Sequence, residues 1–291
     1  MNAASPTLDA PSGTRPLLPA MRILLGAFAV LTALATVALF VLATTTADTF
    51  AWTIQPPLTA AFLGAGYAAG FVLVVLSMRA SFWADVRLPV LTIFVFVVLT
   101  LVATLVHRDK LHFDGDFAAL GALAKGAAWF WLAVYVVLPL AMLVLLVVQE
   151  RAPGGDPPAR HPVPGALRAA LGVESAVLLA VGVPLYAVPT TAATLWPWEL
   201  TPFTARVTAA WLLAFGLATA LAAVAGDLQR LRTATIAYTV FGVLVLISVL
   251  RFLDTVQWGR PVAWLFLAMT VAVVLTGAAG WRAAPAGGDR D

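Results

Sequence analysis

Residues 87–106 read RLPVLTIFVFVVLTLVATLV, and no charged residue follows Arg87 in this stretch. A helix of about 20 apolar residues is long enough to cross a hydrocarbon layer of roughly 30 Å. Because lipid offers no partner for backbone N–H and C=O groups, such a segment crosses the membrane as a helix. Residues 87–106 therefore predict a transmembrane helix.

The rest of the chain has the same apolar character. Of its 291 residues, 62% are hydrophobic and 11% are charged, whereas a soluble domain carries about 25% charge. Apolar runs separated by short polar segments predict eight spans, at residues 22–44, 58–78, 87–106, 127–148, 167–188, 204–225, 232–252 and 262–281. The predicted fold class is an all-α, polytopic transmembrane helical bundle.

The distribution of basic residues predicts the orientation of these spans. Of the 17 Lys and Arg residues, six lie on one side of the predicted spans, namely Arg108, Lys110, Lys125, Arg206, Arg251 and Arg260. Cytoplasmic loops of membrane proteins carry the excess of Lys and Arg. We therefore expect a multi-pass protein of the cell membrane with both of its termini in the cytoplasm. The first apolar run is longer than the core of a signal peptide, and we expect it to be retained as an anchor.

Composition also excludes several classes of function. The chain has no cysteine, which removes disulfides, thiolate metal sites and thiol nucleophiles. Its three histidines lie outside the apolar runs, so no bis-histidine haem site is expected within the membrane. Basic residues occur singly and form no stripe, which argues against nucleic acid. We predict no cofactor and no metal; the expected partners are the lipid bilayer and a membrane protein or a second copy of the chain.

The two halves of the chain resemble each other at a nearly constant offset. A shift of 146 positions places Trp52 on Trp198 and Pro56 on Pro202, and a shift of 145 places Asp109 on Asp254. The last spans share the pattern A-W-x-x-L-A, at residues 128–133 and 263–268. A fixed offset indicates duplication, and an even number of spans per copy keeps both copies parallel. The predicted organisation is a disordered cytoplasmic tail (1–20), a first four-span repeat (21–149), a cytoplasmic linker (150–165), a second repeat (166–282) and a cytoplasmic tail (283–291).

One short motif, W-x-[IL]-x-P followed by Thr-Ala, occurs in both halves. It comprises Trp52 and Pro56 in the first half and Trp198 and Pro202 in the second. Proline suits the first turn of a helix and tryptophan suits the membrane interface, so the motif predicts a device that starts and anchors a helix. The alternative is a pair of short segments that shape an external vestibule between the copies.

Two polar features are further candidates for a functional site. Glu174 is the one carboxylate inside an apolar run, where ionisable residues are costly and often functional; pairing with a basic loop residue is the alternative. The loop from His107 to Asp116 contains two histidines and three carboxylates, but Arg108 and Lys110 would repel a cation. We interpret this loop as a solvated surface loop. Asp109 is the one acidic residue of the loop with a counterpart in the second half, Asp254.

The stretch WPWELTPFTAR, at residues 196–206, and its counterpart around Trp52 resemble uncharacterised multi-pass membrane proteins of high-GC bacteria such as actinobacteria. This resemblance extends over most of the chain after Met21. It implies an integral protein of the bacterial cell membrane and brings no reaction, cofactor or substrate with it.

The sequence leaves three hypotheses for function. The first is transport or small-molecule binding at a site between the two repeats. The second is a non-catalytic membrane scaffold or assembly partner, because no reactive constellation is recognisable. The third and least supported is an enzyme that acts on lipid-linked substrates at the outer face, for which the loop from His107 to Asp116 is the sole basis.

Overall fold

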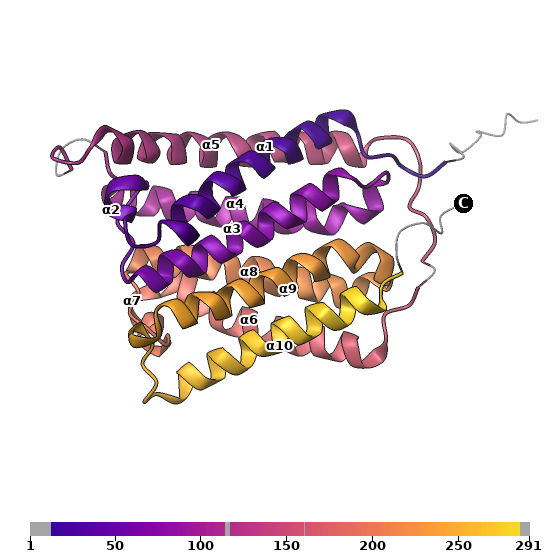
Figure 1. The fold of residues 1–291 in the computed structure, drawn as a ribbon. Coiled ribbons are helices and arrows are strands. Elements are labelled where there is room, and N and C mark those ends of the chain that lie inside the picture. Colours follow the sequence, from indigo (N-terminus) through magenta and orange to yellow (C-terminus); the bar gives the residue numbers. More distant parts are fainter. Residues whose placement is uncertain (1–12, 114–116, 160, 286–291) are drawn as a thin grey trace, which may run out of the picture.

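The computed structural model describes residues 13–113, 117–159 and 161–285, which form a bundle of helices (Figure 1). No strand occurs within these ranges. Eight helices are long and apolar enough to cross a membrane, as the sequence predicted. They are α1 (Pro19–Thr36, continued by a π-helical turn, Val37–Val41), α3 (Pro57–Met78), α4 (Arg87–Val106), α5 (Ala122–Glu150), α6 (Gly165–Ala187), α8 (Pro202–Ala225), α9 (Leu228–Arg251) and α10 (Pro261–Ala283).

Local sequence determines where several of these helices begin and end. Proline occupies the first turn of α1, α3, α8 and α10, where its missing N–H costs nothing. Thr201 caps α8 through a hydrogen-bonded box with Thr204. At the other end of α8, Gly226 has a φ of 71°, a left-handed conformation that suits glycine, and Asp227 then caps α9.

The eight helices pack as two halves with matching contacts. In the first half α1 packs on α3 and α5 on α4; in the second α6 packs on α8 and α10 on α9. Across the seam, α3 packs on α9 and α4 on α8. Each of these contacts has a counterpart when the two halves are exchanged. Two short helices, α2 (Thr46–Thr49) and α7 (Pro189–Ala192), lie at one end of the bundle.

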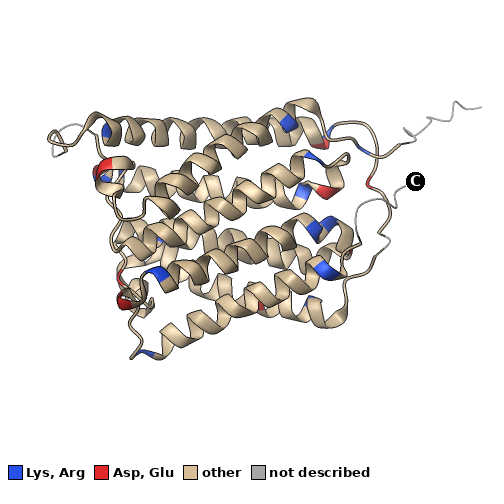
Figure 2. Cartoon of the chain, in the orientation of Figure 1, with Lys and Arg blue, Asp and Glu red and all other residues tan. Residues whose placement is uncertain are grey.

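Charged residues gather at the two ends of the bundle, and its long middle is almost free of them (Figure 2). This distribution is the one that a membrane-spanning protein requires, because the hydrocarbon layer cannot solvate charge. Both described chain ends lie at the end opposite α2 and α7, which is the predicted cytoplasmic end.

The segment before α1 differs from the prediction of a disordered tail through residue 20. Residues 13–18 are described, and Leu17 N–H donates to the Ser81 carbonyl at 2.9 Å while Trp83 N–H donates to the Arg15 carbonyl at 3.0 Å. A proline-rich segment favours an extended backbone, whose polar groups are free to pair with neighbouring loops. The rest of that tail (1–12), the end of the C-terminal tail (286–291) and the loop carboxylates Asp114 and Asp116 lie outside the described residues.

Candidate functional site

A cavity of about 500 Å³ lies in the first half of the described chain. Helices α1, α3, α4 and α5 form most of its wall, and Trp211 and Phe215 of α8 close it toward the second half. Almost all of the lining side chains are apolar or aromatic. A volume between roughly 300 and 1,000 Å³ is typical of sites for small organic molecules.

A pair of tyrosines supplies hydrogen-bonding groups in the cavity wall. The hydroxyl of Tyr67, on α3, lies 2.6 Å from the hydroxyl of Tyr135, on α5. Both side chains are at least 95% buried, and Trp211 meets the Tyr67 ring edge-on at 5.3 Å between centroids. One hydroxyl donates to the other, which leaves one hydroxyl proton and free lone pairs for a third group.

The cavity reaches the surface of the bundle between α1 and α5. Leu34 on α1, and Leu123 and Phe130 on α5, line the cavity and are also more than half exposed. Leu34 and Phe130 lie within the predicted spans 22–44 and 127–148, so their exposed surface faces lipid, whereas Leu123 lies in the first turn of α5 near the outer end of the bundle. The geometry is that of a lateral opening, through which an apolar molecule could pass between bilayer and cavity without crossing water.

Glycines bring helices α9 and α10 of the second half close together. A Cβ atom on Gly277 of α10 would lie 2.5 Å from Thr239 Oγ1 of α9, and one on Gly280 would lie 2.5 Å from Thr235 Cγ2. Such close approach is the role of small residues between membrane helices. In the register of the A-W-x-x-L-A match, the first half carries Met142 and Leu145 at these two positions.

The predicted motif residues Trp52 and Trp198 lie inside the bundle and not at a lipid interface. Trp52 is 2% exposed and Trp198 is 1% exposed. Trp52 lies 4.9 Å from Trp131 and Trp198 lies 5.1 Å from Phe266, centroid to centroid, so each motif packs on the last helix of its own half. The expectation of interface anchoring is therefore wrong for these two rings, because burial against neighbouring aromatic rings offers more contact than the headgroup layer.

The motif prolines are placed as expected for helix starts. Pro202 is the first residue of α8, and Pro56 directly precedes α3 as its N-cap residue. The peptide bond between Gln55 and Pro56 is cis. Neither proline lines the cavity, so their role in the described structure is to position α3 and α8.

Glu174 is 3% exposed and lies between α6 and α10. Thr276 of α10 donates a hydrogen bond to its Oε1 at 2.6 Å, whereas its Oε2 has no hydrogen-bond partner. The predicted alternative, pairing with a basic loop residue, does not occur among the described residues. Glu174 is also outside the large cavity, so the structure does not bring it together with the motif tryptophans.

The loop from His107 to Asp116 is explained by structural contacts as far as it is described. His112 is fully buried; its Nδ1 lies 2.9 Å from the Phe50 carbonyl and its Nε2 3.0 Å from Thr53 Oγ1. Burial lowers the pKa of His112 below its ordinary value, so the neutral ring with Nδ1–H donating fits both bonds. Burial, and then the charge of Arg206, lowers the pKa of His107.

The two acidic residues shared by both halves are exposed and far from a cavity. Asp109 pairs with Lys110 at 2.9 Å, and this hydrogen bond holds the pKa of the carboxyl below its ordinary range. Asp254 is exposed in the equivalent turn of the second half. No group of three or more metal-ligating side chains occurs among the described residues, which do not include Asp114 and Asp116.

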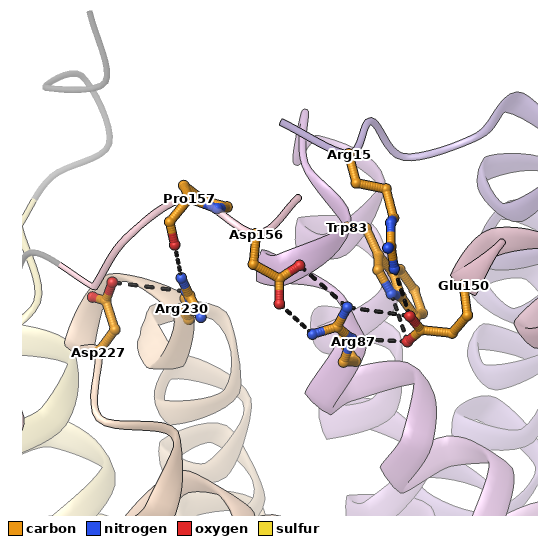
Figure 3. Close-up of polar contacts among 8 residues, drawn as sticks. All are labelled: Arg15, Trp83, Arg87, Glu150, Asp156, Pro157, Asp227 and Arg230. Atoms are coloured by element: carbon orange, nitrogen blue, oxygen red, sulfur yellow. Dashed lines mark hydrogen bonds and ion pairs between the residues drawn. The ribbon is translucent and has the colours of Figure 1, made fainter. Parts of the chain in front are cut away.

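A polar network at the predicted cytoplasmic end ties the linker to both halves (Figure 3). Glu150, the last residue of α5, accepts from Arg15 at 2.6 Å, from Arg87 at 2.9 Å and from the Trp83 indole at 2.9 Å. Arg87 also pairs with Asp156 of the linker at 2.5 Å. Further along the linker, the Pro157 carbonyl accepts from Arg230 of α9. These contacts hold chain segments in place and enclose no cavity.

Sequence reasoning missed the cavity and its tyrosine pair. It placed a binding site between the two halves, whereas the large cavity lies within the first half with one wall from α8. The available signal was the glycine content of the final spans, since Gly277 and Gly280 have no glycine counterparts in the first half. Searches against protein-family models, curated proteins and solved structures found no match for the chain.

Proposed function

We propose that this integral membrane protein binds an apolar, lipid-like molecule in the cavity of its first half. The observation that carries the proposal is the cavity itself: about 500 Å³, lined almost wholly by apolar side chains and laterally open toward the bilayer. Consistent with the predicted location, we place the protein in a bacterial cell membrane with both termini in the cytoplasm.

Selectivity would come from shape and from the tyrosine pair. Lipid tails are as apolar as leucine, so an apolar molecule gains little by moving from bilayer to cavity. A hydrogen bond to Tyr67 or Tyr135 is different, because the bilayer interior offers no such partner. We therefore infer a ligand with an apolar body and one hydroxyl, carbonyl or similar group that reaches these phenols.

We further propose that the two halves descend from one four-span unit and that the first half kept or acquired the cavity. Corresponding loops support this: His112 N–H donates to the Ala51 carbonyl at 2.8 Å, and Gln257 N–H donates to the Pro197 carbonyl at 2.9 Å. These pairs match at offsets of 145 and 146 positions. The matched helix contacts across the seam support the same origin.

The test is to identify what the purified protein retains. Protein isolated in mild detergent is extracted with organic solvent, and bound molecules are quantified by mass spectrometry against bulk lipid. Gly126→Leu narrows the cavity, since Gly126 lines it and a Cβ there meets nothing within 4 Å. Gly172→Leu is the matched control, because Gly172 is exposed on α6 with equally open surroundings.

We expect one class of apolar molecule to be enriched in wild type and in the Gly172→Leu variant and to be depleted in the Gly126→Leu variant. Equal retention by all three proteins would contradict binding in the cavity. Extracts that match bulk lipid, together with a partner protein captured by crosslinking in cells, would favour the scaffold hypothesis instead.

A further inference from the structure

A second polar site lies in the other half of the molecule, around Glu174. This residue is the tenth of α6, roughly 14 Å along the helix from its first residue at 1.5 Å per residue. It lies about 9 Å beyond Arg168, the charged residue nearest the predicted cytoplasmic end of α6, and therefore within a hydrocarbon layer of about 30 Å. At that depth an ionised carboxylate without a cationic partner is strongly disfavoured.

Of the described groups that act on Glu174, none carries a positive charge. Two polar side chains act on it among the described residues: Thr276 from α10, which donates to Oε1, and Tyr238 from α9. The Oε2 atom and the Tyr238 hydroxyl are both buried, and neither makes a hydrogen bond of normal geometry, although the two groups are near enough to interact with each other. A buried carboxyl that cannot find a cation is expected to hold a proton instead.

A small second cavity adjoins this pair on one side. It has a volume of about 50 Å³, enough for roughly one or two waters, and Tyr238 lines it together with Thr92, Thr219 and Thr235. Leu88 and Leu231, from the first turns of α4 and α9, also line it. The cavity therefore lies between Tyr238 and the predicted cytoplasmic ends of α4 and α9, with a mostly apolar lining.

We propose that Glu174 is an intramembrane proton-binding site that exchanges its proton with the cytoplasmic side through Tyr238 and the small cavity. On release, the proton of Oε2 passes to the Tyr238 oxygen while Tyr238 gives its own proton to a water in the cavity. The products are a carboxylate, an intact phenol and a protonated water. Uptake follows the reverse steps. This site is independent of apolar ligand binding in the first half.

Infrared spectroscopy of the full chain in lipid nanodiscs tests the proposal. A protonated carboxyl has a C=O stretching band distinct from that of a carboxylate, and the band shifts when its proton is replaced by deuterium. We expect this band near neutral pH in wild type, its loss in the Glu174→Gln variant and its retention in the Glu199→Gln variant, since Glu199 is exposed. Glu174→Asp keeps an acid at the site and should shift the band, which controls for misfolding of the Gln variant.

The exchange route is tested by the rate of the deuterium shift. Tyr238→Phe should keep the band and slow its shift after transfer to heavy water. Absence of the band in wild type, or its persistence in Glu174→Gln, would overturn the proton site. If the band disappears when sodium replaces potassium in the buffer, Glu174 binds a metal cation and not a proton, and the proton site would be overturned. A deuterium shift in the Tyr238→Phe variant as fast as in wild type would overturn the proposed route.

Discussion

Substitution of Gly277 by methionine, the residue that the first half carries at this position, tests how the second half is closed. A Cβ at Gly277 would lie 2.5 Å from Thr239 Oγ1 and 2.8 Å from the Thr239 backbone nitrogen. These distances are about 1 Å shorter than ordinary contact. Because the second atom belongs to the backbone, it cannot rotate away, and α10 must move off α9.

The expected cost follows from this clash. Overpacking a close-packed interface destabilises by about 1 to 3 kcal/mol. The matched variant Gly172→Met meets no atom within 4 Å of its Cβ and should gain up to about 1 kcal/mol from the higher helix propensity of methionine. Because Gly277→Met gains the same helix propensity, the two variants should differ by the overpacking cost alone, roughly 1 to 3 kcal/mol in free energy of unfolding.

Reversible unfolding in mixed micelles, followed by circular dichroism as the denaturing detergent increases, measures this difference. Thermal unfolding in nanodiscs provides an independent ranking. If Gly277→Met is as stable as Gly172→Met, α9 and α10 do not depend on a glycine at position 277 for their close approach, which would refute the role assigned to this glycine.

Three further predictions concern other contacts. Burial lowers the pKa of His112 below its ordinary value of 6.5. The free energy of unfolding should therefore be greatest above pH 6.5 and fall as the pH drops below it, because the unfolded chain takes up a proton that the folded chain resists. His112→Gln should flatten part of this decline in a pH series of thermal unfolding. Glu150→Gln weakens the half-exposed ion pairs with Arg15 and Arg87 and should cost about 1 kcal/mol of unfolding free energy, a cost that shrinks in high salt. Tyr135→Phe removes one phenol and should weaken retention of the apolar ligand about tenfold, the effect of one lost hydrogen bond of about 1.4 kcal/mol, as measured by mass spectrometry of ligand per protein.

Controls for these predictions use the same assays. A pH decline that is identical in wild type and His112→Gln would show that this histidine does not couple protonation to folding. If the free energy of unfolding that Glu150→Gln loses relative to wild type does not change with salt, the loss comes from packing and not from charge. Ligand retention by Tyr135→Phe equal to that of wild type would remove the phenol pair from recognition.

Much of the candidate site was beyond the reach of sequence reasoning for a specific physical reason. The apolar pattern of a membrane helix is the same whether a residue faces lipid, a neighbouring helix or a cavity. The sequence therefore did not show that Tyr67 and Leu34 line one cavity, because that depends on the positions of α1, α3 and α5. Trp52 and Trp198 were assigned to the interface by their position near span ends. Their burial depends on Trp131 and Phe266, which come from helices far away in the chain.

Residues 87–106 and the other apolar runs determine by themselves that this protein is a bundle of eight membrane helices, because length and hydrophobicity decide whether a segment can cross lipid. Glu174 was likewise identified from sequence, since a lone carboxylate in an apolar run is visible without coordinates. Only the tertiary structure decided that helices of the first half line a cavity of about 500 Å³, whereas α9 and α10 of the second half approach each other closely. That difference depends on interhelical distance, which glycines such as Gly277 reduce only where the facing helix presents a matching surface.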